Sequence, residues 1–318
     1  MSAAPARVLH AGGRVLGLGD RPRLMGVVNA SPDSFSDGGR HASVAEQVEL
    51  ARRLVAAGAE LIDVGGESAA TDRPAVTAAE EIDRVVPVIE RVAHETDALI
   101  SVDTYKPAVA EAALAAGAAM VNDVSGLRDP RVAQVCARTG AALVLVHTQG
   151  APKQKILDHP YESVAREVAE FLAQQMALAR AHGVTAEQLL LDPGPDLGKN
   201  PAQTVESLRA LEALHELGRP LLLAVSRKDF IGALTGRRPR ERLAGTLAAL
   251  AHGVDAGAHI VRVHDVADAA DFLAVRAALA GTAELDANLR LAPGLRREPA
   301  PASDSTTGPS ITVRHRAE

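Results

Sequence analysis

The feature that most constrains the fold is a recurring pair of patterns: a short aliphatic run that ends in polar or glycine residues, then an alanine-rich segment of helical character. The runs are almost wholly apolar, which is typical of parallel strands covered by helices. They are Leu24–Asn29, Leu61–Gly66, Leu99–Thr104, Met120–Ser125, Leu143–His147, Leu189–Asp192, Leu221–Ser226 and Ile260–His264. Eight such repeats predict an α/β protein of the (β/α)8 TIM barrel class.

A doubly wound open sheet is the alternative fold. Such a sheet usually carries a glycine-rich nucleotide loop after its first strand, whereas Asn29-Ala-Ser-Pro32 follows that strand here. Gly58, Gly117 and Gly257 each stand just before a predicted strand, where glycine commonly ends the preceding helix. The barrel is therefore favoured.

The two ends of the chain lie outside the repeat. Residues 1–20 are expected to form an N-terminal segment with a possible hairpin that closes the barrel floor, and residues 21–285 are expected to form the barrel itself. Residues 286–318 are expected to be an extension that is mostly a disordered tail, because residues 298–318 are rich in Pro, Ser and Thr.

Composition excludes several classes of protein. The chain has 318 residues, of which 47% are hydrophobic, and its net charge of −6 gives no general attraction to nucleic acid or anionic membranes. It has no run of 18 apolar residues and no apolar secretory core at its start. The lone Cys136 cannot form an internal disulfide. We expect a cytoplasmic protein that binds neither nucleic acid nor membrane.

Arginine has replaced lysine almost everywhere. Of 34 basic residues only five are lysine, namely Lys106, Lys153, Lys155, Lys199 and Lys228. The two side chains are not interchangeable, so a lysine kept in such a chain is a mild indication that its chemistry matters.

Polar side chains collect where the predicted strands end, which is the edge of a barrel that carries the active site. They are Asn29, Asp63, Glu67, Asp103, Asn122, Asp123, His147, Asp192, Ser226, Arg227, Lys228, Arg262, His264 and Asp265. Any one of them could simply cap the following helix, but all eight strand ends carry at least one. Together they predict a ligand site.

The first kind of ligand group that these residues suit is a nitrogen-rich ring. Asp103, Asn122 and Asp192 supply carboxylates and an amide. Inward-facing carboxylates in a dry pocket pair with N–H donors. They therefore predict a heterocycle with an N–H edge.

The second kind of group is an anion. Arg262 and His264 are two positions apart on one predicted strand, so they share a face, and with Asn29 they form an expected clamp for phosphate. The alternative for Arg262 and His264 is a salt bridge to Asp63 or Asp265. A histidine-based zinc site is not expected, because no histidines show the required ligand spacing.

Seven segments, in order, resemble the signatures of the dihydropteroate synthases, over about residues 10 to 283. They are Met25–Gly39, Ile62–Ser68, Ser101–Thr104, Val121–Val124, Asp192–Gly194, Ser226–Gly232 and Arg262–Val266. The resemblance implies a pterin-binding barrel and a transferase of folate biosynthesis. Its reaction condenses 6-hydroxymethyl-7,8-dihydropterin pyrophosphate with p-aminobenzoate to give 7,8-dihydropteroate and pyrophosphate.

The resemblance also implies roles for particular residues. Those expected to hold the pterin are Asp103, Asn122, Asp192 and Lys228. Those expected to hold the pyrophosphate are Asn29, Arg262 and His264, with Mg²⁺ bridging to Asn29. Those expected to border the aminobenzoate site are Phe35 and Ser226. The expected catalytic residues are Asn29, Lys228, Arg262 and His264.

A homodimer is expected as well. Family members usually pair through their last helices, and the small residues of Leu243–Gly253 would allow close approach of two helices. The alternative is that these residues pack on the barrel itself.

Three departures from the family pattern surround the expected site. Ala69-Ala70 stands where Thr-Arg usually follows Gly-Gly-Glu-Ser, and the Arg-Pro pair comes three residues later at Arg73-Pro74. Val146-His147-Thr148 replaces Met-His-Met. Leu197 replaces a ring-packing phenylalanine, and Asp196 adds a charge.

These departures leave an alternative to the synthase. It is a divergent paralogue that binds pterin but uses another acceptor or has a regulatory, non-catalytic role. A pterin-dependent methyltransferase is disfavoured, because such an enzyme needs no pyrophosphate clamp.

Overall fold

The computed structural model describes residues 7–19, 21–30, 43–68, 73–154, 156 and 159–295. The chain divides into two compact units, Met1–Ala269 and Ala270–Glu318. The first unit holds every described residue of the candidate site. No helix in the described ranges combines the length and the apolar character needed to cross a membrane.

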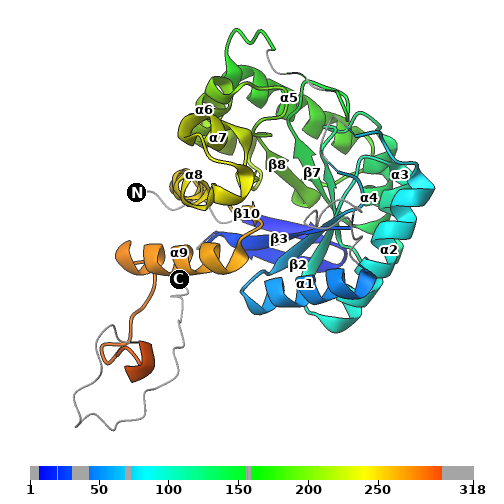
Figure 1. Ribbon diagram of the computed structural model, residues 1–318. Helices are drawn as coiled ribbons and strands as arrows, with labels where there is room; N and C mark the ends of the chain where they lie inside the picture. Colours follow the sequence, from blue (N-terminus) through cyan, green and yellow to red (C-terminus); the bar gives the residue numbers. More distant parts are fainter. Residues whose placement is uncertain are drawn as a thin grey trace. The chain divides into compact units, whose positions relative to one another are not determined.

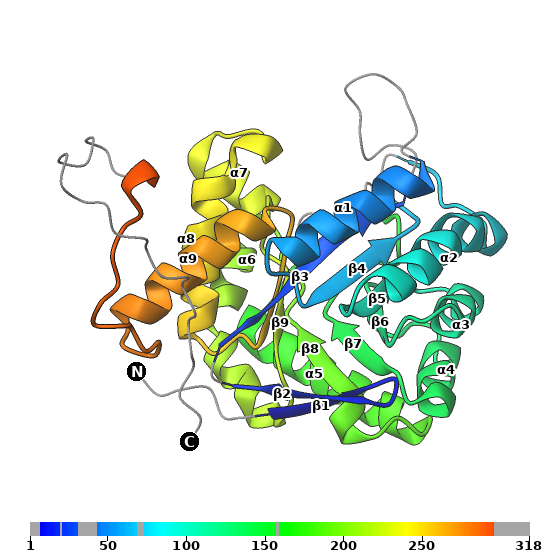
Figure 2. The ribbon, with the colours of Figure 1, turned by 90° about the horizontal axis from the view of Figure 1, so that it is seen from below.

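Parallel strands of the first unit form a closed ring (Figures 1 and 2). In chain order they are β3 (Arg23–Asn29), β4 (Leu61–Gly65), β5 (Leu99–Asp103), β6 (Met120–Asp123), β7 (Ala142–Val146), β8 (Leu189–Asp192), β9 (Leu222–Leu223) and β10 (Ile260–Val263). Each strand from β3 to β8 pairs with the next, β9 pairs with β10, and β10 pairs with β3. A parallel bridge between Leu191 and Leu221 closes the ring. The predicted (β/α)8 TIM barrel is confirmed.

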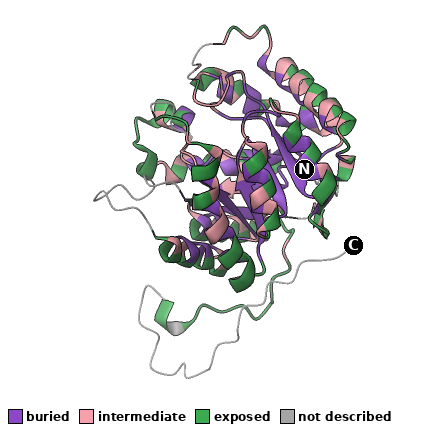
Figure 3. Ribbon diagram, turned by 90° about the vertical axis from the view of Figure 1, so that its right-hand side faces the viewer, coloured by how far each residue is buried: buried purple, intermediate pink, exposed green. Residues whose placement is uncertain are grey.

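Helices follow the strands and lie outside them (Figure 1). They are α1 (Val44–Ala56), α2 (Ala78–Glu95), α3 (Pro107–Ala115), α4 (Arg131–Thr139), α5 (Val164–Ala181), α6 (Pro201–Arg209), α7 (Asp229–Thr235) and α8 (Leu243–Asp255). The strands are buried, whereas the helices alternate between buried and exposed faces (Figure 3). Helix α9 (Val266–Leu279) begins in the first unit and continues into the second.

Glycine ends several of these helices, as predicted. Gly58, Gly117 and Gly257 have φ of 106°, 113° and 83°. This left-handed conformation lets the chain leave a helix and enter the next strand, and it favours glycine because a Cβ would strain it.

A hairpin precedes the barrel. Strands β1 (Arg7–Ala11) and β2 (Arg14–Leu18) pair in antiparallel register. Leu9 and Leu18 are buried in the same apolar cluster as Leu61 and Leu99, the first residues of β4 and β5. The hairpin therefore covers the end of the barrel at which the strands begin (Figure 2). The opposite end is left for a ligand.

One predicted strand is much shorter than expected. The run Leu221–Ser226 forms a strand only at Leu222–Leu223. Arg227 has a left-handed φ of 60°, and its N–H donates to Oγ1 of Thr246 in α8 at 3.0 Å. The backbone therefore turns away from the ladder before Ser226. The expected tail, residues 298–318, lies outside the described residues.

Candidate active site

A cavity of about 550 Å³ lies at the carboxyl ends of the strands. Predicted site residues that line it are Asp103, Asn122, Asp192, Lys228 and Arg262. Strands β5, β6, β8 and β10 bring four of these side chains together, and the loop after β9 brings the fifth. Asn29, Ser226 and His264 are not among the lining residues, and Phe35 lies outside the described residues.

Arg262 is the centre of a polar cluster at the cavity. Its Nε donates to Oδ2 of Asp63 at 2.6 Å, and its Nη2 donates to Oδ2 of Asp103 at 3.0 Å. Asn122 donates from Nδ2 to the same oxygen of Asp63 at 3.1 Å. The salt bridge to Asp63 foreseen as an alternative for Arg262 is thus present, whereas Asp265 pairs with Arg227 instead.

Two oxygens in this cluster have no hydrogen-bond partner. They are Oδ1 of Asp63 and Oδ1 of Asn122, both buried. Buried polar atoms are usually paired, and the oxygens of an ionised carboxylate or a side-chain amide can only accept hydrogen bonds. The cluster therefore offers free acceptor positions that suit a ligand rich in N–H groups.

Burial and like charge perturb the acids of the site. Burial, together with the charge of Asp63, raises the pKa of Asp103 to about 7, against the pull of Arg262. Burial also raises the pKa of Asp192, although the N–H of Gly194 and the charge of Lys228 oppose it. Such shifts are typical of functional sites.

The basic groups respond to the same surroundings. Burial lowers the pKa of Lys228, while Asp196 and Asp192 oppose the change. Burial disfavours the charge of Arg262, but the carboxylates of Asp63 and Asp103 outweigh it and raise the pKa of Arg262. Arg262 is therefore a permanent cation in this cavity.

The three residues expected to form the anion clamp, Asn29, Arg262 and His264, do not share a hydrogen-bond partner among the described residues. His264 follows β10, and its Nδ1 lies 2.9 Å from Oγ of Ser226. Burial and the charge of Arg262 lower the pKa of His264 to about 4, so the ring is neutral near pH 7. Asn29 is exposed at the last position of β3. The hydrogen bonds of Arg262 and His264 thus go to different partners.

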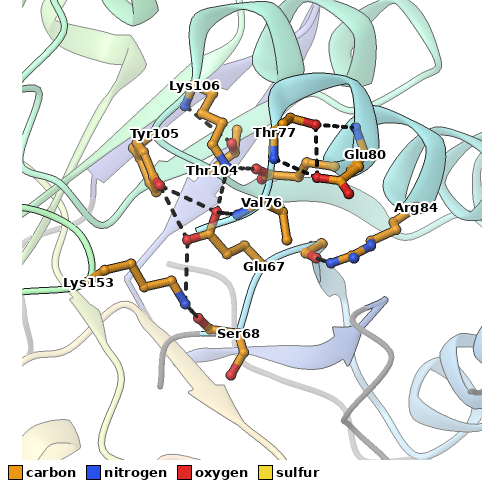
Figure 4. A network of polar contacts seen from close by, with 12 residues as sticks. Glu67, Ser68, Val76, Thr77, Glu80, Arg84, Thr104, Tyr105, Lys106 and Lys153 are labelled. Carbon is orange, nitrogen blue, oxygen red and sulfur yellow. Dashed lines mark hydrogen bonds and ion pairs between the residues drawn. The ribbon is translucent and has the colours of Figure 1, made fainter. Parts of the chain in front are cut away.

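A second network joins the loops that follow β4 and β5 (Figure 4), and of its residues in these loops only Glu67 and Lys106 are singled out by the sequence. Glu67 accepts hydrogen bonds from the Tyr105 hydroxyl at 3.3 Å, from Nζ of Lys106 at 2.5 Å and from the Val76 N–H at 3.4 Å. Lys106 also pairs with the buried Glu81 of α2. One carboxylate therefore holds both sides of the loop that connects β4 to α2. The sequence feature that could have pointed to this network is Lys106, one of the few lysines in an arginine-rich chain.

Lys153 joins a third element to this network. Its Nζ donates to the carbonyl of Ser68 and lies 3.5 Å from Oε1 of Glu67 (Figure 4). Lys153 follows β7 and has a left-handed φ of 66°. The loops after β4 and β7 are therefore tied together at the cavity.

Two of the three departures from the family pattern lie on the cavity wall. Val146, Thr148, Asp196 and Leu197 all line it. Asp196 has a left-handed φ of 64°, and its Oδ2 accepts from the N–H of Asp229 at 2.5 Å. Ala69 and Ala70 lie outside the described residues, and Arg73 is exposed.

Comparison with known proteins gives the same family. Residues 25–264 match the family described as pterin binding enzyme. The curated dihydropteroate synthase of Escherichia coli (strain K12) is 41% identical over 254 residues, which are 80% of this chain and 90% of that protein. This chain belongs to the dihydropteroate synthase family.

Solved structures agree. A dihydropteroate synthase from Xanthomonas albilineans, solved with 4-aminobenzoic acid, is 45% identical and superposes with a TM-score of 0.81. The same enzyme in complex with 7,8-dihydropteroate is 44% identical and has a TM-score of 0.78. Each alignment covers 86% of this chain and 98% of the solved chain. The synthase family resemblance thus extends over the whole barrel.

Proposed function

We propose that this protein is a dihydropteroate synthase of folate biosynthesis, which joins 6-hydroxymethyl-7,8-dihydropterin pyrophosphate to p-aminobenzoate and releases pyrophosphate. The observation that carries the proposal is the hydrogen-bonded cluster of Asp63, Asn122, Asp103 and Arg262, of which the last three line the cavity. Its two unpartnered oxygens match the N–H donors of a pterin edge.

The pterin ring is assigned to Asp103, Asn122, Asp192 and Lys228. The first three supply acceptors for ring N–H groups, and Lys228 supplies a donor for a ring oxygen or nitrogen. All four line one cavity. Their support is this convergence together with the family match.

The chemistry needs no protein nucleophile. The bond that breaks joins the pterin CH₂ carbon to a pyrophosphate oxygen, which leaves with the electron pair. The amine nitrogen of p-aminobenzoate forms the new C–N bond and then loses a proton. The protein must hold the two substrates in line, exclude water and stabilise the departing charge. The lone thiol is unsuited to attack, because burial raises the pKa of Cys136 to about 12.

The pyrophosphate is assigned to Arg262, His264 and Asn29. Arg262 supplies a permanent charge and a planar pair of N–H donors. His264, which is neutral near pH 7, supplies at most one N–H donor. The Arg262 guanidinium would exchange at least part of its contact with Asp103 for a phosphate oxygen.

Mg²⁺ is proposed as the accompanying ion. No group of three or more His, Cys, Asp or Glu side chains in the described part of the chain is arranged to hold a metal. This fits Mg²⁺, which usually binds through one or two protein oxygens and through substrate phosphates. The exposed amide oxygen of Asn29 would hold it, and the ion would neutralise charge on the leaving group.

The remaining expectations stay predictions. Phe35 and Ser226 are proposed to border the aminobenzoate site, and the protein is proposed to be cytoplasmic.

The glycines of Leu243–Gly253 pack on the barrel: a Cβ at Gly253 would lie 1.9 Å from Leu223, and one at Gly245 would lie 2.3 Å from Ile231. The proposed homodimer therefore rests on the family alone, and its mass in solution tests it.

A direct assay tests the proposed function. The protein is mixed with the pterin pyrophosphate and p-aminobenzoate, and released pyrophosphate and dihydropteroate are measured. Release that depends on p-aminobenzoate supports the synthase. Pterin binding without release supports the regulatory paralogue, and release with a different amine supports another acceptor.

A further inference from the structure

Lys199 is a buried lysine that the proposed chemistry does not use. It is 3% exposed and lies in the loop between β8 and α6, seven residues after Asp192. It does not line the cavity, and neither does His147, which it contacts. Burial of an ammonium group is costly unless its donors are paired, so its contacts need an explanation.

The Lys199 ammonium uses all three of its donors. Nζ donates to the carbonyl of Pro193 at 2.9 Å and to the carbonyl of Gly194 at 3.0 Å. Its third partner is Nδ1 of His147 at 2.7 Å. Burial lowers the pKa of Lys199 to about 7, although the charge of Asp192 opposes the change. When this amine is protonated it only donates, so Nδ1 accepts and the ring proton lies on Nε2. Burial and the charge of Lys199 lower the pKa of His147 to about 2, which keeps the ring a neutral acceptor.

The two carbonyls belong to the turn that sets the Asp192 carboxylate. The Gly194 N–H donates to Oδ1 of Asp192 at 2.7 Å. Gly194 has a φ of 62°, and a Cβ there would lie 1.9 Å from the carbonyl oxygen of His147. The His147 N–H in turn donates to the carbonyl of Asp192 at 2.9 Å. The turn is thus fixed against the end of β7 from several sides.

A lysine suits this position better than an arginine would. Three acceptors converge on one nitrogen, which matches the tripod of an ammonium and does not match the planar fork of a guanidinium. The chain has kept lysine here although it uses arginine almost everywhere else. The positive charge also opposes the rise that burial causes in the pKa of Asp192.

We propose that Lys199 is a positioning residue for the pterin: with His147 as its fixed acceptor, it holds the Pro193-Gly194 turn so that the Asp192 carboxylate faces the ring in one orientation. The proposal rests on the proposed function, since it takes Asp192 as a pterin ligand. Lys199 acts through the turn and does not touch either substrate.

The test compares Lys199→Met with a matched control, Gln188→Met. Gln188 is also buried, and its Nε2 also donates to two backbone carbonyls, those of Cys136 at 3.0 Å and Ala141 at 2.7 Å. It precedes β8, at the end of the strand away from the cavity. Both substitutions leave two backbone carbonyls without their buried side-chain donor, so both are expected to lower the free energy of unfolding.

Only Lys199→Met is expected to change pterin recognition. Its KM and calorimetric Kd for the pterin pyrophosphate should rise at least about tenfold, the equivalent of one charged hydrogen bond. Its KM for p-aminobenzoate should stay unchanged. Lys199→Arg should not rescue the loss, because the fork cannot reach all three acceptors. Equal pterin affinity in Lys199→Met and Gln188→Met would overturn the proposal.

A milder variant covers the case in which Lys199→Met does not fold. His147→Leu removes one acceptor and leaves both carbonyl contacts, whereas His147→Gln can keep an acceptor. We expect weaker pterin binding in the first and partial recovery in the second, and equal binding in the two would contradict the role of His147. The calorimetry needs no turnover, so an inactive parent that still binds pterin would refute the synthase alone. A parent that binds no pterin would refute both proposals.

Discussion

Nη2 of Arg262 donates to Oδ2 of Asp103 at 3.0 Å, which joins the carboxyl ends of β10 and β5 across 159 residues of sequence. The same guanidinium holds Asp63, so one cation lies between two carboxylates at the wall of the cavity. Without it, Asp63 would keep only its hydrogen bond from Asn122, and Asp103 would lose its cationic partner. Arg262 therefore holds Asp103, a proposed pterin ligand, and itself lines the cavity in which an anion would bind.

Arg262→Lys is expected to lose most activity although the charge is kept. The ammonium cannot reproduce the paired N–H donors that contact Asp63 and Asp103. Loss of one charged hydrogen bond predicts a fall in kcat/KM of roughly 10- to 150-fold. Arg219→Lys is the control, because Arg219 is buried and bonds the carbonyls of Leu189 and Val8 away from the cavity. Equal kinetics in the two variants would make Arg262 purely structural.

Asp103→Asn should reduce pterin binding more than it reduces stability. The carboxylate can accept two N–H bonds from a pterin edge, and each charged hydrogen bond contributes about 1.5–3 kcal/mol. The amide keeps the shape, so the fold should persist. Calorimetry with the pterin pyrophosphate measures the effect, and unchanged affinity in a folded variant would remove Asp103 from the site.

The raised pKa of Asp103 predicts a pH effect on pterin affinity. The pKa is about 7, so the group becomes protonated as the pH falls through 7. A protonated carboxyl accepts N–H bonds less well, and affinity should weaken by up to about tenfold per pH unit. Asp103→Asn should lack this dependence. A wild-type affinity that is flat between pH 6 and 8 would contradict it.

The same shift has a consequence for folding. Between the ordinary 3.8 and about 7, the folded protein binds more protons at Asp103 than the unfolded chain does. Stability contributed by this group is therefore lost as the pH rises through that window. Urea unfolding at several pH values should show this slope in the wild type and a smaller slope in Asp103→Asn.

The barrel and part of its site could be predicted because local sequence decides them. Apolar runs specify buried strands, and the rule that barrel chemistry lies at strand ends brought Asp103, Asn122 and Asp192 together before the structure did. The early end of β9 could not be foreseen, because nothing in the run Leu221–Ser226 marks it. The left-handed turn at Arg227 and its bond to Thr246, 19 residues away, are visible only in the structure.

The side-chain networks that support the site could not be predicted from the sequence either. Glu81 lies in the first turn of α2, is 1% exposed and pairs with Lys106, 25 residues away. The contact of Lys199 with His147 spans 52 residues, and beside it the left-handed Gly194 leaves no room for a Cβ against the His147 carbonyl. Such contacts follow from how the loops fold over the strand ends, which no local pattern encodes.

Leu9→Ala should destabilise the protein without changing its chemistry. Leu9 is fully buried in the hairpin that covers the barrel floor. Removing a buried leucine side chain typically costs about 2–5 kcal/mol in the free energy of unfolding. Urea unfolding measures this cost, while kcat and both KM values should stay at the wild-type level. A loss of activity in the folded variant would show that the floor and the site are coupled.

The last prediction concerns the residues that follow Ser68. The family resemblance implies that Thr-Arg-Pro after Gly-Gly-Glu-Ser would contact the amine substrate, which sulfonamides mimic. Ala69-Ala70 offers neither hydroxyl nor charge, while Glu67 and the Ser68 carbonyl are held by Lys106 and Lys153. Recruiting Arg73 in their place would mean ordering further loop residues, at roughly 1–2 kcal/mol each. We therefore expect weak p-aminobenzoate binding, poor sulfonamide inhibition and ordinary pterin affinity.

The double substitution Ala69→Thr with Ala70→Arg should strengthen amine and sulfonamide binding and leave the pterin Kd unchanged. Sulfonamide potency in the unaltered protein equal to that of an ordinary synthase would show that these alanines are neutral.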